Sequence, residues 1–423
     1  MRIRFIYPKF EKLLESRNEL LELADVESVG NFKMPPALGI PMLSALTPDS
    51  HQCSVFDENI QEIDYNDDAD LFAVSFFTPQ AEYAYKIAQK LRENGKTVIA
   101  GGMHPTVMPD EAANYFDAVC VGEAEDVWLE ILKDVENKSL KKFYYGGSPD
   151  LTNIPAPNRS IFKNKDGYDW DARMIQVMRG CACNCENCIL PIESGKKYRF
   201  CSIENVLKEI STFEKKDFFL TDDSLVLTNS ECTDYMGKLM KAFSQLDEKP
   251  RVFISGSLNM NIDAAYLKSL YDGGVVSVYM VLGCDPFSIN AFRKNGKRFF
   301  DWGIDIIKRI QDSGIHVFNS HGLGFDYQDH SLFDQALEFS KQASIETAEF
   351  YILTPFPQTP SWHRFQKEDR ILHYNWSKYN TANVVFKPKN FTEQELLDGY
   401  LYCWKEFYKG RKIDESLNIF KGK

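Results

Sequence analysis

The most distinctive segment of the sequence is RGCACNCENC at residues 179–188. Four of the chain's ten cysteines lie in it, directly after an apolar run from Met174 to Met178 that predicts a strand. Thiolates are soft ligands that suit iron–sulfur clusters and zinc. The concentration of cysteines therefore indicates metal chemistry at the carboxyl end of a strand.

Three of these cysteines have a spacing that suits one cluster. Cys181, Cys185 and Cys188 follow the pattern Cys-x3-Cys-x2-Cys, and Cys183 is an extra thiol inside the loop. Three thiolates on a four-iron cluster leave one iron open to chelate a small molecule. The alternative is a structural zinc site with four thiolates. Zinc sites usually pair two Cys-x2-Cys units some distance apart, and no second pair lies nearby, so the sequence favours the cluster.

Strand and helix signals alternate from about residue 170 onward. The strands are predicted at 174–178, 218–220, 252–255, 275–282, 316–318 and 350–353. Apolar residues at helical spacing run from Ile203 to Phe213, and a capping-box pattern at Thr228 and Glu231 predicts the start of the next helix. A last helix is predicted at 393–408. Six strand–helix units predict a partial (β/α)6 barrel, whose ligands bind at the carboxyl ends of the strands.

The first third of the chain alternates in the same way. Strands are predicted at 2–7, 53–57, 70–77, 97–100 and 118–121, with a helix at 83–92. Because parallel strands need a crossover between them, this order predicts a doubly wound, Rossmann-like parallel sheet. Ligands of such sheets bind at the carboxyl ends of the strands. Those ends carry Ser75 to Thr78, Gly101 to Thr106 and the pair Gly122-Glu123.

The length of 423 residues predicts two or three domains. Residues 146–165 are rich in Gly, Pro, Asn and Ser and lack a clear period, so a linker is expected there. The predicted divisions are a sheet domain at 1–140, a linker at 141–168, a barrel core at 169–385 and a C-terminal helical extension at 386–423.

The charge balance and the apolar runs limit the class of protein. With 49 Lys and Arg against 61 Asp and Glu, the formal net charge is −12, which argues against a non-specific nucleic-acid binder. No apolar run reaches the roughly 18–20 residues of a membrane span. The first residues lack the long apolar core of a signal peptide. A cytoplasmic protein without a membrane span is therefore predicted.

The chain resembles a known family at several of these points. The cluster loop resembles that of the radical S-adenosylmethionine (SAM) superfamily, and the whole chain resembles the group with an N-terminal cobalamin (vitamin B12)-binding domain. The likeness extends over nearly all of the chain. It is carried by Pro35 to Leu43, Gly101 to Thr106, AVCVGEAEDVWLEIL at 118–132, PAPNRSIF at 155–162, the cluster loop and LTPFPQTP at 353–360.

The resemblance implies three cofactors and their ligands. A [4Fe-4S] cluster on Cys181, Cys185 and Cys188 would cleave S-adenosyl-L-methionine reductively, and the sheet domain would bind cobalamin. Candidate SAM contacts at the strand ends of the barrel are Asp222, Asp223, Gly283 and Asp285. Candidate cobalamin contacts are Ser75, Thr78, Gly101, Gly102, His104, Gly122 and Glu123. The resemblance assigns no catalytic residue.

The sequence departs from the family pattern in places. Asn187 stands where an aromatic residue usually precedes the third cysteine, and Gln358 stands where Gly is usual. Many cobalamin proteins ligate cobalt through an Asp-x-His-x-x-Gly loop after the first strand, but no histidine follows strand 2–7. Base-off cobalamin without a histidine lower ligand is therefore predicted. His104 has two open interpretations, a ligand contact or a buttress of the turn before Pro105.

Three functions remain open at this stage. The first is a cobalamin-dependent methyltransferase acting on an unactivated carbon. The second is a radical SAM enzyme for a rearrangement, elimination or cyclisation. The third is a non-catalytic cobalamin or iron–sulfur sensor, against which the six-unit second domain argues. A small-molecule, lipid or peptide substrate and an electron donor such as flavodoxin or ferredoxin are the expected partners, and a nucleic acid is not.

Overall fold

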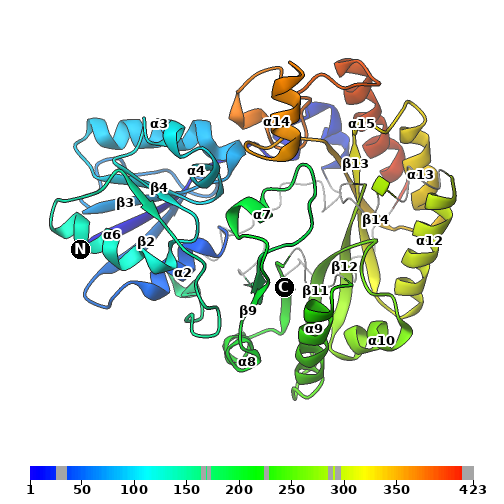
Figure 1. The fold of residues 1–423 in the computed structure, drawn as a ribbon, viewed down its shortest axis with the longest axis horizontal. Coiled ribbons are helices and arrows are strands. Elements are labelled where there is room, and N and C mark those ends of the chain that lie inside the picture. The colour runs from blue at the N-terminus through cyan, green and yellow to red at the C-terminus, as the bar shows by residue number, and fades with distance from the viewer. Residues whose placement is uncertain are drawn as a thin grey trace.

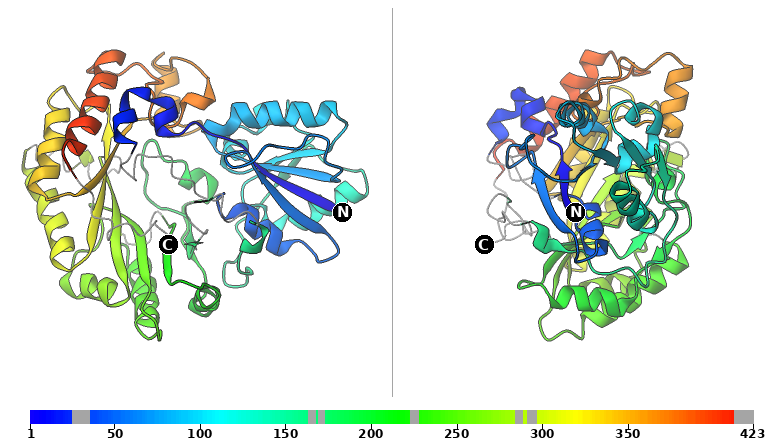
Figure 2. Two further views of the ribbon diagram at one scale, coloured as in Figure 1. Left: turned by 180° about the vertical axis from the view of Figure 1, so that it is seen from behind. Right: turned by 90° about the vertical axis from the view of Figure 1, so that its left-hand side faces the viewer.

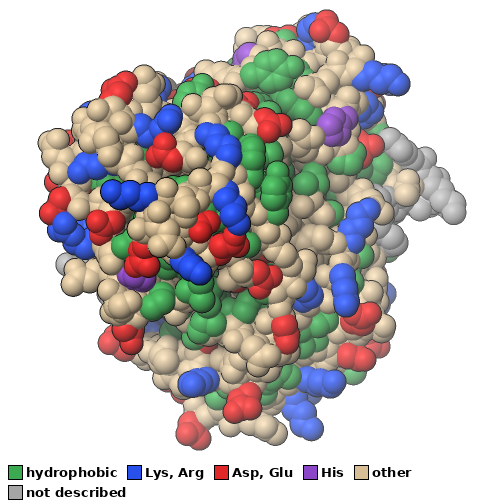
Figure 3. Space-filling view, turned by 60° about the vertical axis from the view of Figure 1, so that its left-hand side comes forward, with side chains coloured by type: hydrophobic (Ala, Val, Ile, Leu, Met, Phe, Trp, Pro, Cys, Tyr) green, Lys and Arg blue, Asp and Glu red, His purple; other side chains and the backbone are tan. Residues whose placement is uncertain are grey.

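The structure is a computed structural model that describes residues 1–24, 36–162, 168, 173–222, 228–283, 289–290 and 297–411, with side chains from residue 300 onward in the last range. Two α/β bodies lie side by side in it (Figure 1). Within the described residues, no helix is both long and apolar enough to span a membrane. Acidic and basic side chains are interspersed over the face seen in Figure 3, which shows no broad basic area.

The first body is a six-stranded parallel sheet in the order β2-β1-β3-β4-β5-β6. Its strands are β1 (Arg2–Tyr7), β2 (Gln52–Asp57), β3 (Leu71–Ser75), β4 (Val98–Gly101), β5 (Ala118–Val121) and β6 (Phe143–Tyr145). Successive residues of β3 pack on opposite faces, since Phe72 and Val74 belong to one apolar core and Leu71 and Ala73 to another. The sheet continues beyond the boundary predicted at residue 140, because β6 pairs with β5.

Helices cover both faces of this sheet, as the doubly wound prediction requires. One face carries α3 (Ala81–Glu93) and α5 (Pro109–Ala112), and the other carries α2 (Gly39–Leu46) and α6 (Trp128–Glu136). Figure 1 shows α3 and α6 on opposite sides of the sheet, and α4 (Met103–Val107) follows the end of β4. The strand order reverses beside β1, which pairs with both β2 and β3. This reversal places a ligand crevice at the carboxyl ends of the central strands.

The second body is a partial barrel with six parallel strands in the order β14-β13-β12-β11-β10-β7. The strands are β7 (Met174–Ile175), β10 (Asp217–Leu220), β11 (Arg251–Ser257), β12 (Val275–Leu282), β13 (His316–Leu323) and β14 (Thr347–Ile352). The helices between and after them are α8 (Ile203–Ser211), α9 (Ser230–Phe243), α10 (Ala264–Asp272), α12 (Lys297–Asp312), α13 (Leu332–Gln342) and α15 (Glu393–Tyr408). Figure 2 shows these helices on the outer side of the curved sheet. The predicted doubly wound sheet, partial barrel and C-terminal helix are thus confirmed.

Two local expectations were wrong. The strand expected at 174–178 is broken into β7 and β8 (Met178–Arg179), because the carboxylate of Asp222 accepts the backbone N–H groups of Val177 at 3.0 Å and Met178 at 2.8 Å. Helix α9 is capped by Asn229 rather than Thr228, since the Asn229 side chain accepts the N–H of Glu231 at 2.8 Å.

Each body contributes side chains that pack in the hydrophobic core of the other body. Helix α1 (Leu13–Ser16) and the 3-10 helix η1 (Asn18–Leu23) leave the first sheet, and Leu14, Leu20 and Leu23 pack in the core of the barrel. Figure 2 shows this N-terminal segment beside α15. In return, Trp362 and Trp376 pack in the core of the first body. These exchanges fix the two bodies against each other.

Candidate cofactor and active site

A cavity of about 410 Å³ lies at the carboxyl ends of the first sheet. We call it cavity A. Its walls include Ser75, Gly101, Gly102, Gly122 and Glu123, which are five of the seven predicted cobalamin contacts. The second body closes the cavity with Met174, Gln176, Arg179, Leu190, Glu193, Ser194 and Thr221. Cavity A therefore faces the strand ends of the second body.

Two glycines in the wall of cavity A have structural reasons to be glycine. Gly102 has φ +97°, and a Cβ there would lie 2.9 Å from the backbone N of Phe76. Gly122 has φ +84°, and its Cβ would lie 3.2 Å from the carbonyl oxygen of Gly146. Most of the remaining wall is apolar, including Ala73. Bare backbone and an apolar wall fit the broad, largely apolar faces of a corrin ring.

Two predicted cobalamin contacts lie away from cavity A. His104 is fully buried, with Nε2 at 3.0 Å from the Tyr85 hydroxyl and Nδ1 at 3.2 Å from Oγ1 of Thr78. Its ring packs edge-on against Trp376. Burial lowers the pKa of His104, despite the neighbouring carboxylate of Glu111. This placement favours the buttress interpretation of His104 over a ligand contact.

A buried ionic cluster joins the two bodies at the wall of cavity A. Arg179 donates to Glu123 Oε2 at 2.5 Å and to Glu125 Oε1 at 2.6 Å. Arg199, on β9 (Arg199–Phe200), donates to Glu123 Oε2 at 3.0 Å and also pairs with Oε1. Burial on its own would lower the pKa of Arg179, but the carboxylates of Glu125 and Glu123 raise it above its usual value. The Glu123 carboxylate is thus engaged by two arginines.

Glu123→Ala is expected to destabilise the contact between the bodies. Breaking a buried ion pair leaves charged groups without compensation and costs about 3–5 kcal/mol of unfolding free energy. Urea unfolding followed by tryptophan fluorescence measures this. Glu130→Ala is the control, because Glu130 pairs with Lys141 on the surface. Equal urea midpoints for the two variants would contradict the role of the cluster.

The cysteine loop lies between β8 and α7 (Leu190–Glu193) and is held at its start. Gly180 has φ +93°, and a Cβ there would lie 2.1 Å from the carbonyl oxygen of Lys197. The N–H of Cys181 donates to the carbonyl of Gly195 at 3.0 Å, and the N–H of Cys188 donates to that of Cys185 at 3.4 Å. Three thiol side chains on one short loop have the donor chemistry of an iron–sulfur cluster.

The structure does not by itself assign the metal ligands. Across the described residues, no three histidine, cysteine or carboxylate side chains form a group that could hold a metal ion. The assignment of Cys181, Cys185 and Cys188 therefore stays a prediction, which rests on their spacing and on the anchored start of the loop.

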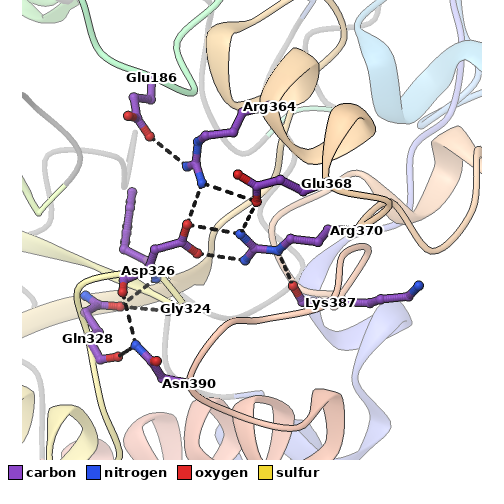
Figure 4. A network of polar contacts seen from close by, with 10 residues as sticks. Glu186, Gly324, Asp326, Gln328, Arg364, Glu368, Arg370, Lys387 and Asn390 are labelled. Carbon is purple, nitrogen blue, oxygen red and sulfur yellow. Dashed lines mark hydrogen bonds and ion pairs between the residues drawn. The ribbon is translucent and has the colours of Figure 1, made fainter.

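A polar network fastens the cysteine loop to the far end of the barrel (Figure 4). Glu186 lies between the second and third predicted ligands, and its carboxylate accepts Arg364 Nη2 at 2.9 Å. Its carbonyl accepts the N–H of Ser361 at 2.7 Å. Arg364, on α14 (Pro360–Lys367), also pairs with Asp326, which Arg370 binds at 2.7 Å. Asp326 follows the end of β13, so the network links the cysteine loop to the strand ends.

Arg364→Met is expected to loosen the cysteine loop without unfolding the protein. The Arg364–Glu186 pair is partly exposed, so its loss is worth up to about 1 kcal/mol. That corresponds to iron loss up to about fivefold faster when a chelator competes for the reconstituted cluster. Arg309→Met on α12 removes a comparable exposed pair with Asp305 and serves as the control. Equal rates in both variants would count against the tether.

The predicted SAM contacts fall into three situations. Asp222 is buried, and its carboxylate is bonded to the backbone at the break between β7 and β8. Gly283 has φ +86°, accepts a hydrogen bond from the Tyr327 hydroxyl at 2.8 Å and lines a small cavity of about 130 Å³. Asp223 and Asp285 lie outside the described residues.

A second cavity, of about 510 Å³, lies beside cavity A, and we call it cavity B. Phe77 and Met103 line both cavities. Ile189, which directly follows Cys188, and Thr78 line cavity B as well. Its far wall is formed by β14 and by the N-terminal segment at 10–13. Cavity B thus adjoins both the cysteine loop and the predicted cobalamin site.

The sequence alone did not identify the partners that organise this site. The arginine pair on Glu123 and the Arg364 tether bring together residues far apart in the chain. Glu349, which lines cavity B, is a charged residue in the otherwise largely apolar strand β14. That single interruption of an apolar strand was the signal that could have found it.

Known proteins resemble this chain in both sequence and fold. The B12 binding domain family matches residues 36–132. Bacteriochlorophyllide d C-8(2)-methyltransferase of Chlorobaculum tepidum is 29% identical over 403 residues, which cover 89% of this chain and 88% of that protein.

Solved structures share the whole two-body arrangement. The radical SAM methyltransferase TsrM of Kitasatospora setae, with cobalamin and a [4Fe-4S] cluster bound, matches with a TM-score of 0.63 and 13% identity over 87% of this chain and 75% of that one. The cobalamin-dependent SAM radical enzyme OxsB, with aqua-cobalamin and SAM bound, matches with a TM-score of 0.66 and 13% identity over 93% of this chain and 65% of that one. With the fold and the cysteine loop, these matches show that the chain is similar to radical SAM enzymes that carry an N-terminal cobalamin-binding domain.

Proposed function

We propose that the protein is a cobalamin-dependent radical SAM methyltransferase that methylates an unactivated carbon. The observation that carries the proposal is the adjacency of the two cavities: cavity A lies at the strand ends of the cobalamin-binding body, and cavity B lies beside both cavity A and the cysteine loop. Methyl transfer to a carbon radical requires the methyl donor and the radical generator to reach one substrate atom, and this arrangement supports that requirement.

The residues of the chain would bind and orient these groups. Cys181, Cys185 and Cys188 would hold the cluster, and Ser75, Gly101, Gly102 and Gly122 would line the cobalamin site. When bound, the cluster with SAM supplies hydrogen abstraction from carbon, and cobalamin supplies methyl transfer. The exchanged core segments and the Glu123 cluster would keep the two cofactor sites in register. Leu190 and Met103 would exclude water from the space between them.

The proposal extends to the partners and the location. Reductive SAM cleavage consumes an electron, so the proposal includes a one-electron donor such as flavodoxin or ferredoxin. A cytoplasmic location is included, because cysteine thiols stay reduced there. The matched relative named as a bacteriochlorophyllide methyltransferase supports methylation over a non-methylating rearrangement, elimination or cyclisation. The substrate is proposed to be a small molecule, lipid or peptide.

A direct test screens substrates under anaerobic conditions. Reconstituted protein is incubated with cobalamin, SAM, a reductant and bacteriochlorophyllide d, and then with other candidate substrates. The masses of the products are measured by mass spectrometry. A mass gain of one methylene that depends on added cobalamin is the expected result. Substrate conversion with 5′-deoxyadenosine release but without any mass gain would favour the non-methylating alternative.

A further inference from the structure

We infer that cavity B binds the substrate, and that this substrate is a flat conjugated molecule bearing a nitrogen that donates a hydrogen bond to Glu349. The inference rests on the proposed function, because it names the class of molecule that the same site would methylate.

Both bodies contribute aromatic rings to the wall of cavity B. Tyr7 and Phe77 come from the ends of β1 and β3, whereas Tyr351, Phe356 and Tyr379 come from β14 and the segment after it. Flat conjugated molecules gain from stacked and edge-on contact with such rings beyond the area that they bury. A cavity of about 510 Å³ has the size of a site for a small organic molecule.

Glu349 places a carboxylate in this wall. Ser320 donates to its Oε1 at 2.8 Å, and Tyr279 donates to the same oxygen. Among the described residues, no donor is bonded to Oε2 and no lysine, arginine or histidine pairs with Glu349. Its side chain remains partly accessible although it lies inside the barrel. One oxygen of the carboxylate is therefore available to a ligand.

Burial makes an uncompensated carboxylate unfavourable. Burial raises the pKa of Glu349, and the hydrogen bonds from Tyr279 and Ser320 lower it only in part. The other carboxylate in this wall, Glu11, is already paired with Lys378 at 2.8 Å. A ligand N–H, and above all a protonated nitrogen, would supply the missing donor at Glu349. An anionic ligand group would meet repulsion there.

Aromatic side chains also line the inner face of the barrel, and one of them contacts Glu349. The rings of Phe219 and Phe253 lie 4.8 Å apart on neighbouring strands, and those of Tyr279 and Phe318 lie 5.3 Å apart. Tyr279 is the residue that bonds Glu349. A flat ligand held by Glu349 would therefore find rings on the barrel side as well as in the wall of cavity B.

Equilibrium binding tests the inference without turnover. The full chain, reconstituted with its cluster and kept free of reductant, is titrated with two flat fluorescent probes of similar shape. 9-Aminoacridine is cationic and donates N–H bonds, whereas 9-anthracenecarboxylate is anionic. Wild-type protein is expected to bind 9-aminoacridine at least about tenfold more tightly, the effect of one hydrogen bond to a charged group. Equal affinities, or a preference for the anion, would overturn the inference.

Three variants assign the preference to the carboxylate. Glu349→Gln is expected to weaken 9-aminoacridine binding about tenfold or more. Glu338→Gln, on the exposed side of α13, is the matched control and leaves binding unchanged. Tyr279→Phe removes one hydroxyl donor and keeps the carboxylate, so binding of the cation stays equal or tightens. Tyr279→Phe remains informative if Glu349→Gln does not fold. A tenfold loss of 9-aminoacridine affinity in Tyr279→Phe would contradict the inference. Probe binding requires no methyl transfer, so failure of the proposed reaction remains distinguishable.

Discussion

Cys185→Ala protein, reconstituted anaerobically with iron and sulfide, is expected to retain almost no [4Fe-4S] cluster and to cleave no SAM. Cys185 and Cys188 lie on one turn, in which the N–H of Cys188 donates to the carbonyl of Cys185. Three thiolates are the minimum set for the predicted open-iron cluster, so the loss of one should exceed the ~10–100-fold effect of changing an outer-shell partner.

Cys183→Ala is the matched control for this prediction. Cys183 lies in the same loop, is partly exposed and is not among the three predicted ligands. Iron content, visible absorbance and 5′-deoxyadenosine release are measured for both variants. Full cluster retention in Cys185→Ala, or a loss of cluster confined to Cys183→Ala, would contradict the ligand assignment.

Gly101→Leu is expected to weaken cobalamin binding about 10- to 100-fold and to reduce methyl transfer accordingly. Gly101 ends β4 and lines cavity A. A Cβ there would meet only the Cβ of Cys120, at 4.0 Å, so a leucine fits the backbone and occupies cavity space. Inserting methylenes into an occupied site costs about 1–3 kcal/mol, which corresponds to that loss of affinity.

Gly237→Leu provides the control, because a Cβ at this position of α9 meets no atom within 4 Å and lies far from cavity A in the fold. Cobalamin uptake is measured by absorbance after desalting, and folding by the thermal transition. If Gly101→Leu binds cobalamin as the wild type does, cavity A is not the corrinoid site.

The sequence predicted what local patterns determine. Helix α15 runs from Glu393 to Tyr408 as expected, because a capping box at Thr392 and Glu395 marks its start. Strand β1 also matches its predicted range, since Arg2 and Arg4 alternate with the buried Ile3 and Phe5 at the period of a strand. The glycine turns after β4 and β5 fall at cavity A, because parallel sheets bind ligands at their carboxyl ends.

Features that depend on distant residues could not be predicted in this way. The break at Val177 is made by the carboxylate of Asp222, and the burial of His104 depends on Trp376. No local pattern around Arg199 indicates its partner, and only the fold reveals it as Glu123 of the other body. Such contacts carry no periodic signal, because their partners are far apart in the chain.

The reaction that we propose is methyl transfer from SAM to carbon in the space between the two bodies. The most direct measurement uses SAM labelled in its methyl group, with reconstituted cluster, cobalamin, reductant and the true substrate. We expect labelled methyl on carbon of the product, together with 5′-deoxyadenosine and S-adenosylhomocysteine. Turnover that releases 5′-deoxyadenosine but yields neither labelled product nor S-adenosylhomocysteine would contradict it.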